Sequence, residues 1–300
     1  MSLEQEILKL KKKRDAVILA HNYQISAIQD IADFVGDSLE LAKTAKKAEK
    51  STIVFCGVKF MAETAKILSP EKKVLLPSLD AGCPLADMIE PSQLLELKQK
   101  YPKAQVVSYV NTSAEIKALS DVCCTSSNAV TVVKNIPSDM VIFTPDRNLG
   151  WWVKKNVPDK KLIIWKGFCL VHEYFSLEDL RAARKAHPDA EILAHPECRK
   201  EILEEADFVF STSGMLKHAQ ESSAKKFIIG TEEGLIYRLK KENPQKIFYS
   251  LGPARTCINM KKTTLRDLYN ALDKEDCQIE LDSDIIKKAS QALERMVKYV

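Results

Sequence analysis

The chain has 300 residues, 45% of them hydrophobic and 29% charged, and its 45 basic and 41 acidic residues give a formal net charge of +4. These values are typical of a soluble globular protein with two or three domains. There is no basic patch interleaved with aromatic residues, so we do not expect nucleic-acid binding. No apolar run reaches the roughly 18 residues of a membrane span, and residues 1–15 do not read as a secretory signal. We therefore expect a cytoplasmic protein with no membrane partner.

Short apolar runs alternate with helical patterns along the chain. After an amphipathic helix at 1–15, helices are predicted at 91–102, 113–120, 128–136 and 149–157, each followed by a strand, at 104–110, 121–126, 139–145 and 161–167. The last third predicts strands at 191–196, 207–213, 226–231 and 246–252, and a closing helix at 282–300 capped by Asp282 or Ser283. Apolar strands that alternate with helices indicate parallel sheets covered on both faces. The expected fold class is α/β, built from three-layer αβα sandwiches.

Several features recur three times at the same interval. Cys83, Cys169 and Cys257 are 86 and 88 residues apart, and the same two intervals separate His21, Tyr109 and His195, then Asp33, Asp121 and Asp207, then Gly57, Pro145 and Thr231. We therefore predict three similar units arranged with pseudo-threefold symmetry. Their expected boundaries are 1–88, 89–174 and 175–300, and the last unit includes the closing helix.

The recurring residues lie where parallel α/β units bind ligands, beyond the carboxyl ends of the strands. His21, Tyr109 and His195 end the first strand of their units. A hydroxyl residue follows each of them 17 positions later, at Ser38, Ser126 and Thr212, where a helix begins. One interpretation is that these hydroxyls cap the helices. Three hydroxyls in register beside His and Tyr favour the other interpretation, which is binding of a phosphate or carboxylate at helix N-termini.

Each unit closes on one cysteine, which we expect at the end of its fourth strand. Three converging thiolates could hold zinc with an open fourth position, or a [4Fe–4S] cluster with one iron that has no protein ligand. Zinc usually draws its cysteines from CxxC pairs, which this sequence lacks, so the long spacing favours a cluster. An open iron can act as a Lewis acid on substrate oxygen. The other five cysteines are interpreted as packing or structural residues: Cys56, Cys123, Cys124, Cys198 and Cys277.

A few residues are candidates for acid–base chemistry. Glu197, at a strand end, is a candidate general base, with His195 and Tyr109 orienting the substrate. Tyr23 is a second candidate acid or base, and His172, three residues after Cys169, is expected near the cluster region. The His-x-Glu pattern at 195–197 also occurs in zinc deaminases, but their PCxxC motif is absent here.

The sequence resembles the quinolinate synthase family in a specific combination of motifs: ILAHNYQ, DIADFVGDSLELA, GVKFMAETAKIL, YVNTSAE, TSSNAV, PDRNLG, GFCLVH, AHPEC and NMKKTTL. The resemblance covers nearly the whole chain. It implies three αβα units around a central cavity that holds one [4Fe–4S] cluster. It also implies condensation of iminoaspartate (iminosuccinate) with dihydroxyacetone phosphate to quinolinate, with loss of phosphate and two waters, in de novo NAD biosynthesis. A transient link to the enzyme that produces iminoaspartate is consistent with this role.

The resemblance also assigns roles to individual residues. Cluster ligands fall on Cys83, Cys169 and Cys257, and proton transfer falls on Tyr23 and Glu197. Substrate-binding positions fall on His21, Ser38, Tyr109, Val110, Asn111, Ser126, His195, Pro196, Glu197 and Thr212. Two departures are small: Ser127 stands in TSSN where the family usually has TSAN, and STSG at 211–214 replaces STG. The 17-residue register favours Thr212 over Ser211 at the second of these.

Two other functions fit a three-cysteine cluster. One is an aconitase-like hydro-lyase that acts on another carboxylate, which a phosphate requirement would distinguish. The other is a non-enzymatic iron–sulfur redox sensor, although no segment is left over for a DNA-binding or partner-binding module. Radical chemistry with S-adenosylmethionine lacks its CxxxCxxC signature.

Overall fold

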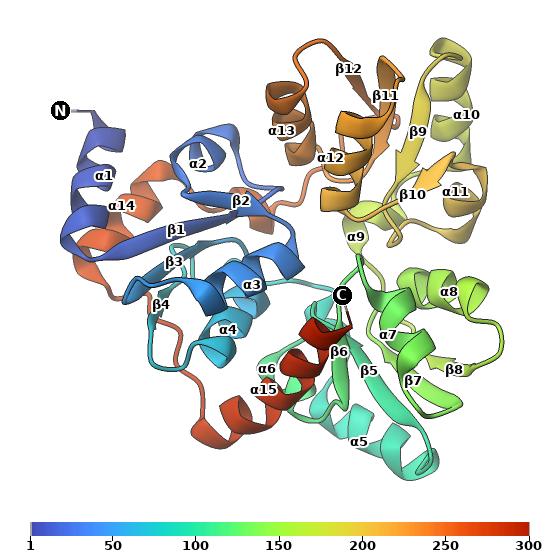
Figure 1. Ribbon diagram of the computed structural model, residues 1–300, viewed down its shortest axis with the longest axis horizontal. Coiled ribbons are helices and arrows are strands. Elements are labelled where there is room, and N and C mark those ends of the chain that lie inside the picture. The colour runs from blue at the N-terminus through green and yellow to red at the C-terminus, as the bar shows by residue number, and fades with distance from the viewer. Residues whose placement is uncertain (1, 300) are drawn as a thin grey trace.

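The computed structural model describes residues 2–299, so Met1 and Val300, at the outer ends of the two predicted terminal helices, lie outside the described residues. The molecule has three lobes, and each contains one four-stranded parallel sheet flanked by helices (Figure 1). The α/β class is therefore confirmed. The pseudo-threefold relation between the units and their boundaries at 88 and 174 stay predictions.

All three sheets have the same strand order, with the first strand between the second and the third. The first lobe has the order β2 (Phe34–Gly36), β1 (Ala16–His21), β3 (Thr52–Cys56), β4 (Lys73–Leu75). The second has β6 (Val122–Cys124), β5 (Gln105–Tyr109), β7 (Met140–Thr144), β8 (Lys161–Ile164), and the third has β10 (Phe208–Val209), β9 (Glu191–Ala194), β11 (Lys226–Gly230), β12 (Ile247–Ser250). Because parallel strands end at the same edge of a sheet, each lobe has one edge at which loops and their side chains gather.

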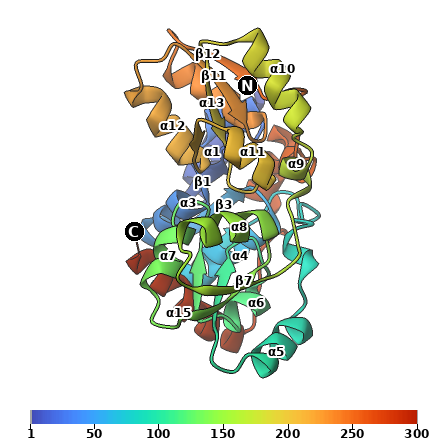
Figure 2. The same cartoon turned by 90° about the vertical axis from the view of Figure 1, so that its right-hand side faces the viewer.

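Helices flank each sheet. The first lobe has α1 (Leu3–Lys13), α2 (Ser26–Ile31), α3 (Ser38–Lys47) and α4 (Lys59–Leu68), and the second has α5 (Pro91–Lys100), α6 (Ala114–Ala118), α7 (Ala129–Asn135) and α8 (Arg147–Asn156). The third has α10 (Leu177–Ala186), α11 (Lys200–Glu205), α12 (Thr212–Glu221) and α13 (Gly234–Glu242). The short helix α9 (Leu170–Glu173) lies where the second and third lobes meet (Figures 1 and 2).

The recurring aspartates fasten the first strand of each sheet to the start of its edge strand. Asp33 Oδ2 accepts a hydrogen bond from the Ile18 amide at 2.8 Å. Asp121 and Asp207 bind the corresponding amides of Val106 and Ile192 at 2.7 and 2.8 Å. A carboxylate therefore satisfies the same strand amide in all three lobes, which explains this part of the repeat without a catalytic role.

The C-terminal helices leave the third lobe. Asp282 caps α15 (Ser283–Lys298), which confirms the predicted closing helix. The buried stripe of α15 is Ala289, Ala292, Leu293 and Met296, and the helix packs on α6 and β6 of the second lobe and on α4 of the first. The preceding helix α14 (Leu265–Lys274) lies against α1 (Figure 1). The last two helices therefore pack on the first and second lobes, although they follow the third lobe in the sequence.

The five cysteines interpreted as packing residues are buried, as expected: Cys56, Cys123, Cys124, Cys198 and Cys277. Within residues 2–299, every helix is too short or too polar to cross a membrane.

Candidate active site

A cavity that is partly open to solvent lies where the three lobes meet. Each lobe contributes predicted site residues: His21, Tyr23 and Ser38 from the first, Tyr109, Asn111 and Ser126 from the second, and His195, Glu197 and Thr212 from the third. Cys83, Cys169 and Cys257 line the same cavity. Two predicted binding residues, Val110 and Pro196, are buried and are not among the residues that line it.

The three cysteines lie in loops beyond the sheets. The expectation that each fourth strand ends at its cysteine is wrong, because pairing ends five to eight residues earlier, at the ends of β4, β8 and β12. Each loop is held by the same backbone hydrogen bond, from an amide after the third strand to the carbonyl two residues before the cysteine. The bonds run from Lys59 to Ala81 at 2.8 Å, from Arg147 to Gly167 at 2.7 Å, and from Glu233 to Arg255 at 3.0 Å. The sequence repeat therefore corresponds to a repeated local geometry.

Each cysteine is followed by a short helical turn that directs an amide at its sulfur. Burial raises the pKa of Cys83 to about 12 and raises the pKa values of Cys169 and Cys257 above the ordinary value. An amide three residues after each cysteine, in Ala86, His172 and Met260, hydrogen-bonds the sulfur and opposes this rise in pKa. Buried thiols must lose their protons to bind a metal, and these amides stabilise the resulting thiolates.

Two buried carboxylates support the cysteine loops, and sequence reasoning missed both. Asp146 accepts a hydrogen bond from the Cys169 amide at 3.1 Å, and Glu232 accepts one from the Cys257 amide at 3.0 Å. Burial raises the pKa of each carboxyl group. They are 86 residues apart, but the residue type changes between them, and Val58 occupies the corresponding position in the first unit.

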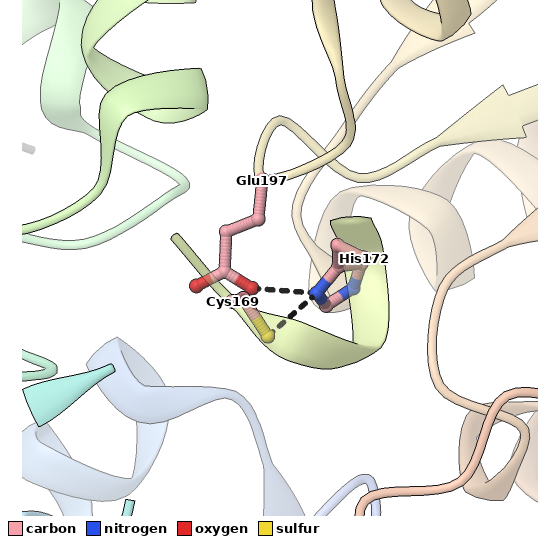
Figure 3. Close-up of side chains that lie close together, drawn as sticks. All are labelled: Cys169, His172 and Glu197. Atoms are coloured by element: carbon pink, nitrogen blue, oxygen red, sulfur yellow. Dashed lines mark hydrogen bonds and ion pairs between the residues drawn. The ribbon is translucent and has the colours of Figure 1, made fainter. Parts of the chain in front are cut away.

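A chain of hydrogen bonds links the first lobe to the third through α9. The Tyr23 hydroxyl lies 2.5 Å from Thr231 Oγ1, which lies 2.8 Å from Nε2 of His172. On the other side of its ring, His172 Nδ1 lies 2.8 Å from Glu197 Oε2 and 3.2 Å from Cys169 Sγ (Figure 3). The sequence marked Thr231 only as a recurring position, and it placed His172 near the cluster region without indicating its contacts with Glu197 and Thr231.

The protonation states of the acidic groups in this series of hydrogen bonds follow from burial and from the neighbouring side chains. Burial alone would raise the pKa of Glu197, but the ion pair and hydrogen bond with His172, together with His195 and Tyr109, lower it to about 2. Glu197 is therefore ionised and accepts from His172 Nδ1–H. On the other side of the ring, Nε2 of His172 contacts Thr231 Oγ1, and Thr231 Oγ1 contacts the Tyr23 hydroxyl. Burial also raises the pKa of Tyr23 well above its ordinary value, so this hydroxyl keeps its proton.

His21 and His195 have matching surroundings. Nδ1 of His21 accepts from the Tyr23 amide at 3.2 Å, and Nδ1 of His195 accepts from the Glu197 amide at 3.3 Å. Burial lowers the pKa of each histidine to about 3. Both rings are therefore neutral with the proton on Nε2, and His195 donates it to Ser126 Oγ at 3.2 Å. A neutral N–H donor can orient a substrate oxygen without adding charge.

The cavity hydroxyls lie at or near helix N-termini. Ser38 and Thr212 are the first residues of α3 and α12, whose capping side chains are Asp37 and Ser211. The capping interpretation is therefore wrong for Ser38 and Thr212. Ser126 lies three residues before α7 begins. Hydroxyls beside the positive ends of helices are suited to anions.

Comparison with known proteins identifies the family. The family model described as quinolinate synthetase A protein matches residues 5–298. The chain belongs to this family. The quinolinate synthase of Thermodesulfovibrio yellowstonii is 55% identical over 296 residues, which cover 99% of this chain and 98% of that protein. Those of Caldicellulosiruptor saccharolyticus and Alkaliphilus metalliredigens are 53% and 54% identical over 296 and 293 residues, or 98% and 97% of their own lengths.

The sulfurs of the three cavity cysteines of this quinolinate synthetase A family member are not all within 4.8 Å of one another among the described residues. Tetrahedral zinc, with bonds of about 2.3 Å to sulfur, holds its thiolates about 3.8 Å apart. In the part of the chain that the structure describes, the set of three donor atoms within 4.8 Å of one another is Cys169, His172 and Glu197, not the three cysteines. The wider cysteine spacing, with an amide directed at each sulfur, fits a polynuclear iron–sulfur group better than a single ion.

Proposed function

We propose that the protein is a quinolinate synthase. In this reaction iminoaspartate condenses with dihydroxyacetone phosphate to quinolinate, with loss of phosphate and two waters, in the biosynthesis of NAD. One observation carries the proposal: a single cavity combines cysteines, acid–base side chains and anion-suited hydroxyls from all three lobes. The family membership of nearly the whole chain supports it.

We also propose that Cys83, Cys169 and Cys257 hold one [4Fe–4S] cluster with one iron free of protein ligands. When bound, such a cluster supplies a Lewis acid that polarises a substrate oxygen and assists the loss of water. The shared loop geometry and the amides at the sulfurs support this assignment.

The hydrogen-bonded chain moves protons in this proposal. Glu197 is the general base, because its carboxylate lies at the cavity wall and within hydrogen-bond reach of His172. Tyr23 is the acid at the far end, and Thr231 and His172 connect it to Glu197. A proton moves between Tyr23 and Glu197 along these hydrogen bonds when the Thr231 hydroxyl and the His172 ring exchange their donor and acceptor roles.

The remaining predicted residues bind and orient the substrates. The hydroxyls of Ser38, Ser126 and Thr212 hold the phosphate and carboxylate groups, helped by the amides of the helix N-termini. Neutral His21 and His195 and the hydroxyl of Tyr109 donate hydrogen bonds to substrate oxygens, and Asn111 lies 3.4 Å from Glu197 and fixes its carboxylate. Contacts from Val110 and Pro196 stay predictions.

The proposal is tested by assaying quinolinate and released phosphate in protein purified without oxygen and supplied with both substrates. Quinolinate formed together with phosphate is the expected result. A cluster-loaded protein that dehydrates another carboxylate, with no need of a phosphate ester, would replace the proposal with a hydro-lyase. A full cluster with neither activity would favour the redox sensor.

The cellular setting is also part of the proposal. We propose a cytoplasmic enzyme that receives iminoaspartate through a transient link to the enzyme that produces it. Free iminoaspartate should then be used less efficiently than iminoaspartate generated in the same solution by that enzyme. Equal rates of quinolinate formation from both sources of iminoaspartate would contradict the proposed link.

A further inference from the structure

Three side chains of different chemistry point at one spot in the cavity wall (Figure 3). Cys169 Sγ, His172 Nδ1 and a carboxylate oxygen of Glu197 all lie within 4.8 Å of one another. Sulfur, imidazole nitrogen and carboxylate oxygen are the three ligand types that Zn²⁺ takes from proteins. We propose that these residues bind a single Zn²⁺ ion when the protein lacks its cluster. Only one of the three belongs to the cysteine set described above.

Two of the three pairs of donor atoms are close to the separations that zinc requires. Cys169 and His172 lie on one turn of chain at the start of α9, so their side chains share a face. Nδ1 of His172 lies 3.2 Å from the sulfur and 2.8 Å from Glu197 Oε2. Ideal tetrahedral zinc would separate these pairs by about 3.6 and about 3.4 Å, so the side chains need to spread by about half an ångström.

Each ligand is oriented by a further partner, as is usual for ligands in metal sites. His172 Nε2 lies 2.8 Å from Thr231 Oγ1, so this nitrogen can hold the ring proton while Nδ1 binds the ion. The second oxygen of Glu197 lies 3.4 Å from the Asn111 amide group. The backbone amide of Cys169 is held by Asp146 at 3.1 Å. The site is therefore supported on all three ligands.

The protons released and the charges neutralised on Zn²⁺ binding can be accounted for. Cys169 releases its thiol proton to solvent as the zinc–sulfur bond forms. His172 binds the ion through Nδ1 without a proton there and keeps one ring proton on Nε2, which donates to Thr231 Oγ1. One thiolate and one carboxylate neutralise the ion, and a water completes the fourth position.

Zinc at this site and a cluster on the three cysteines exclude each other. Both need Cys169, and zinc would also occupy His172 and Glu197 of the proton chain. This consequence rests on the proposed function, whereas zinc binding itself does not. It predicts that protein preloaded with one equivalent of Zn²⁺ takes up less iron and sulfide during anaerobic reconstitution than protein without zinc.

The test uses the full chain, freed of cluster by a chelator under anaerobic conditions and titrated with Co²⁺ as a spectroscopic substitute for Zn²⁺. The expected result is one Co²⁺ per chain, with the visible bands of four-coordinate cobalt and a thiolate-to-cobalt band. Zn²⁺ should displace it, because a thiolate ligand in a tetrahedral site favours zinc. Cys169→Ser should abolish the thiolate band, and Thr231→Val should weaken binding about 10–100-fold by removing a partner of the ligand histidine.

Matched controls separate this site from other cobalt sites. Cys83→Ser and Cys257→Ser should keep the wild-type cobalt spectrum, as should His187→Gln, which changes a histidine outside the cavity. Cobalt lost equally from all three cysteine variants would place the ion among the cysteines and overturn the proposal. So would a folded wild-type protein without a thiolate-to-cobalt band, or a folded His172→Gln variant with full affinity. The quinolinate assay of cluster-loaded protein is independent of this titration, so the two proposals can fail separately.

Discussion

The Thr231 hydroxyl joins two buried groups, and replacing it with a methyl group tests the proton chain. Thr231→Val keeps the shape of the side chain but leaves the Tyr23 hydroxyl and Nε2 of His172 without this partner. Each buried polar group left unpaired costs about 1–3 kcal/mol, and the added methyl returns about 0.8 kcal/mol. The free energy of unfolding of the cluster-free protein should therefore fall by about 1–5 kcal/mol.

The activity of the Thr231→Val variant should fall as well, because the series of hydrogen bonds between Tyr23 and Glu197 would be interrupted. Loss of a positioned acid–base group typically costs a factor of about 10²–10⁴, so quinolinate formation should slow at least about 100-fold. Iron content should not change, since the hydrogen bonds of Thr231 among the described residues go to Tyr23 and His172 and not to a cysteine. A loss of activity with full iron content would distinguish an interrupted proton chain from a damaged cluster site.

Thr263→Val is the matched control. Thr263 is also buried, but its hydroxyl has no hydrogen-bond partner among the described residues. Its removal should leave stability unchanged or slightly higher and should not alter the rate. Urea unfolding and steady-state quinolinate formation would be measured on both variants. Equal stability and equal activity of the two variants would refute the assigned role of Thr231.

Three further predictions concern other parts of the account. Burial lowers the pKa of His21 from 6.5 to about 3. Between pH 6.5 and about 3 the unfolded chain therefore binds a proton at His21 that the folded chain does not. The free energy of unfolding falls as the pH drops through this range, by up to about 1.4 kcal/mol per pH unit. His21→Gln should remove this contribution from urea-unfolding curves between these pH values, whereas His187→Gln should retain it. Asp207→Asn weakens the acceptor of a strand amide and should cost about 1–3 kcal/mol by thermal unfolding, in contrast to the exposed Asp189→Asn. Glu197→Gln should fold and keep its cluster yet turn over at least about 100-fold more slowly, and normal turnover would remove Glu197 from the mechanism.

Much of the fold could be predicted because the strands are continuous apolar runs. The burial of β3 on both faces, for example, matches its sequence of five residues without alternation. The packing of α15 could not be predicted in the same way. Its stripe of apolar residues shows that one face is buried, but it contains nothing that selects the second lobe over the third as the partner.

The site could be predicted where chemistry repeats at a fixed spacing, as it does for the cysteines and the strand-end residues. Asp146 and Glu232 were missed because their type changes between units. The link from Tyr23 to Thr231 was missed because it joins side chains 208 residues apart, and hydrogen bonds of that kind leave no local pattern. The cysteines were placed at strand ends because a strand pattern does not reveal where pairing with the neighbouring strand stops.

The central claim, that three cysteines from three lobes hold one cluster, is tested most directly by counting iron and acid-labile sulfide per chain after purification without oxygen. Wild-type protein should contain about four of each, as a [4Fe–4S] cluster requires. Replacing any one of Cys83, Cys169 or Cys257 with Ala should abolish this content, whereas Cys198→Ala, at a buried cysteine beside the cavity, should keep it. Zinc in place of iron in the wild type, or a full cluster in one of the three variants, would contradict the account.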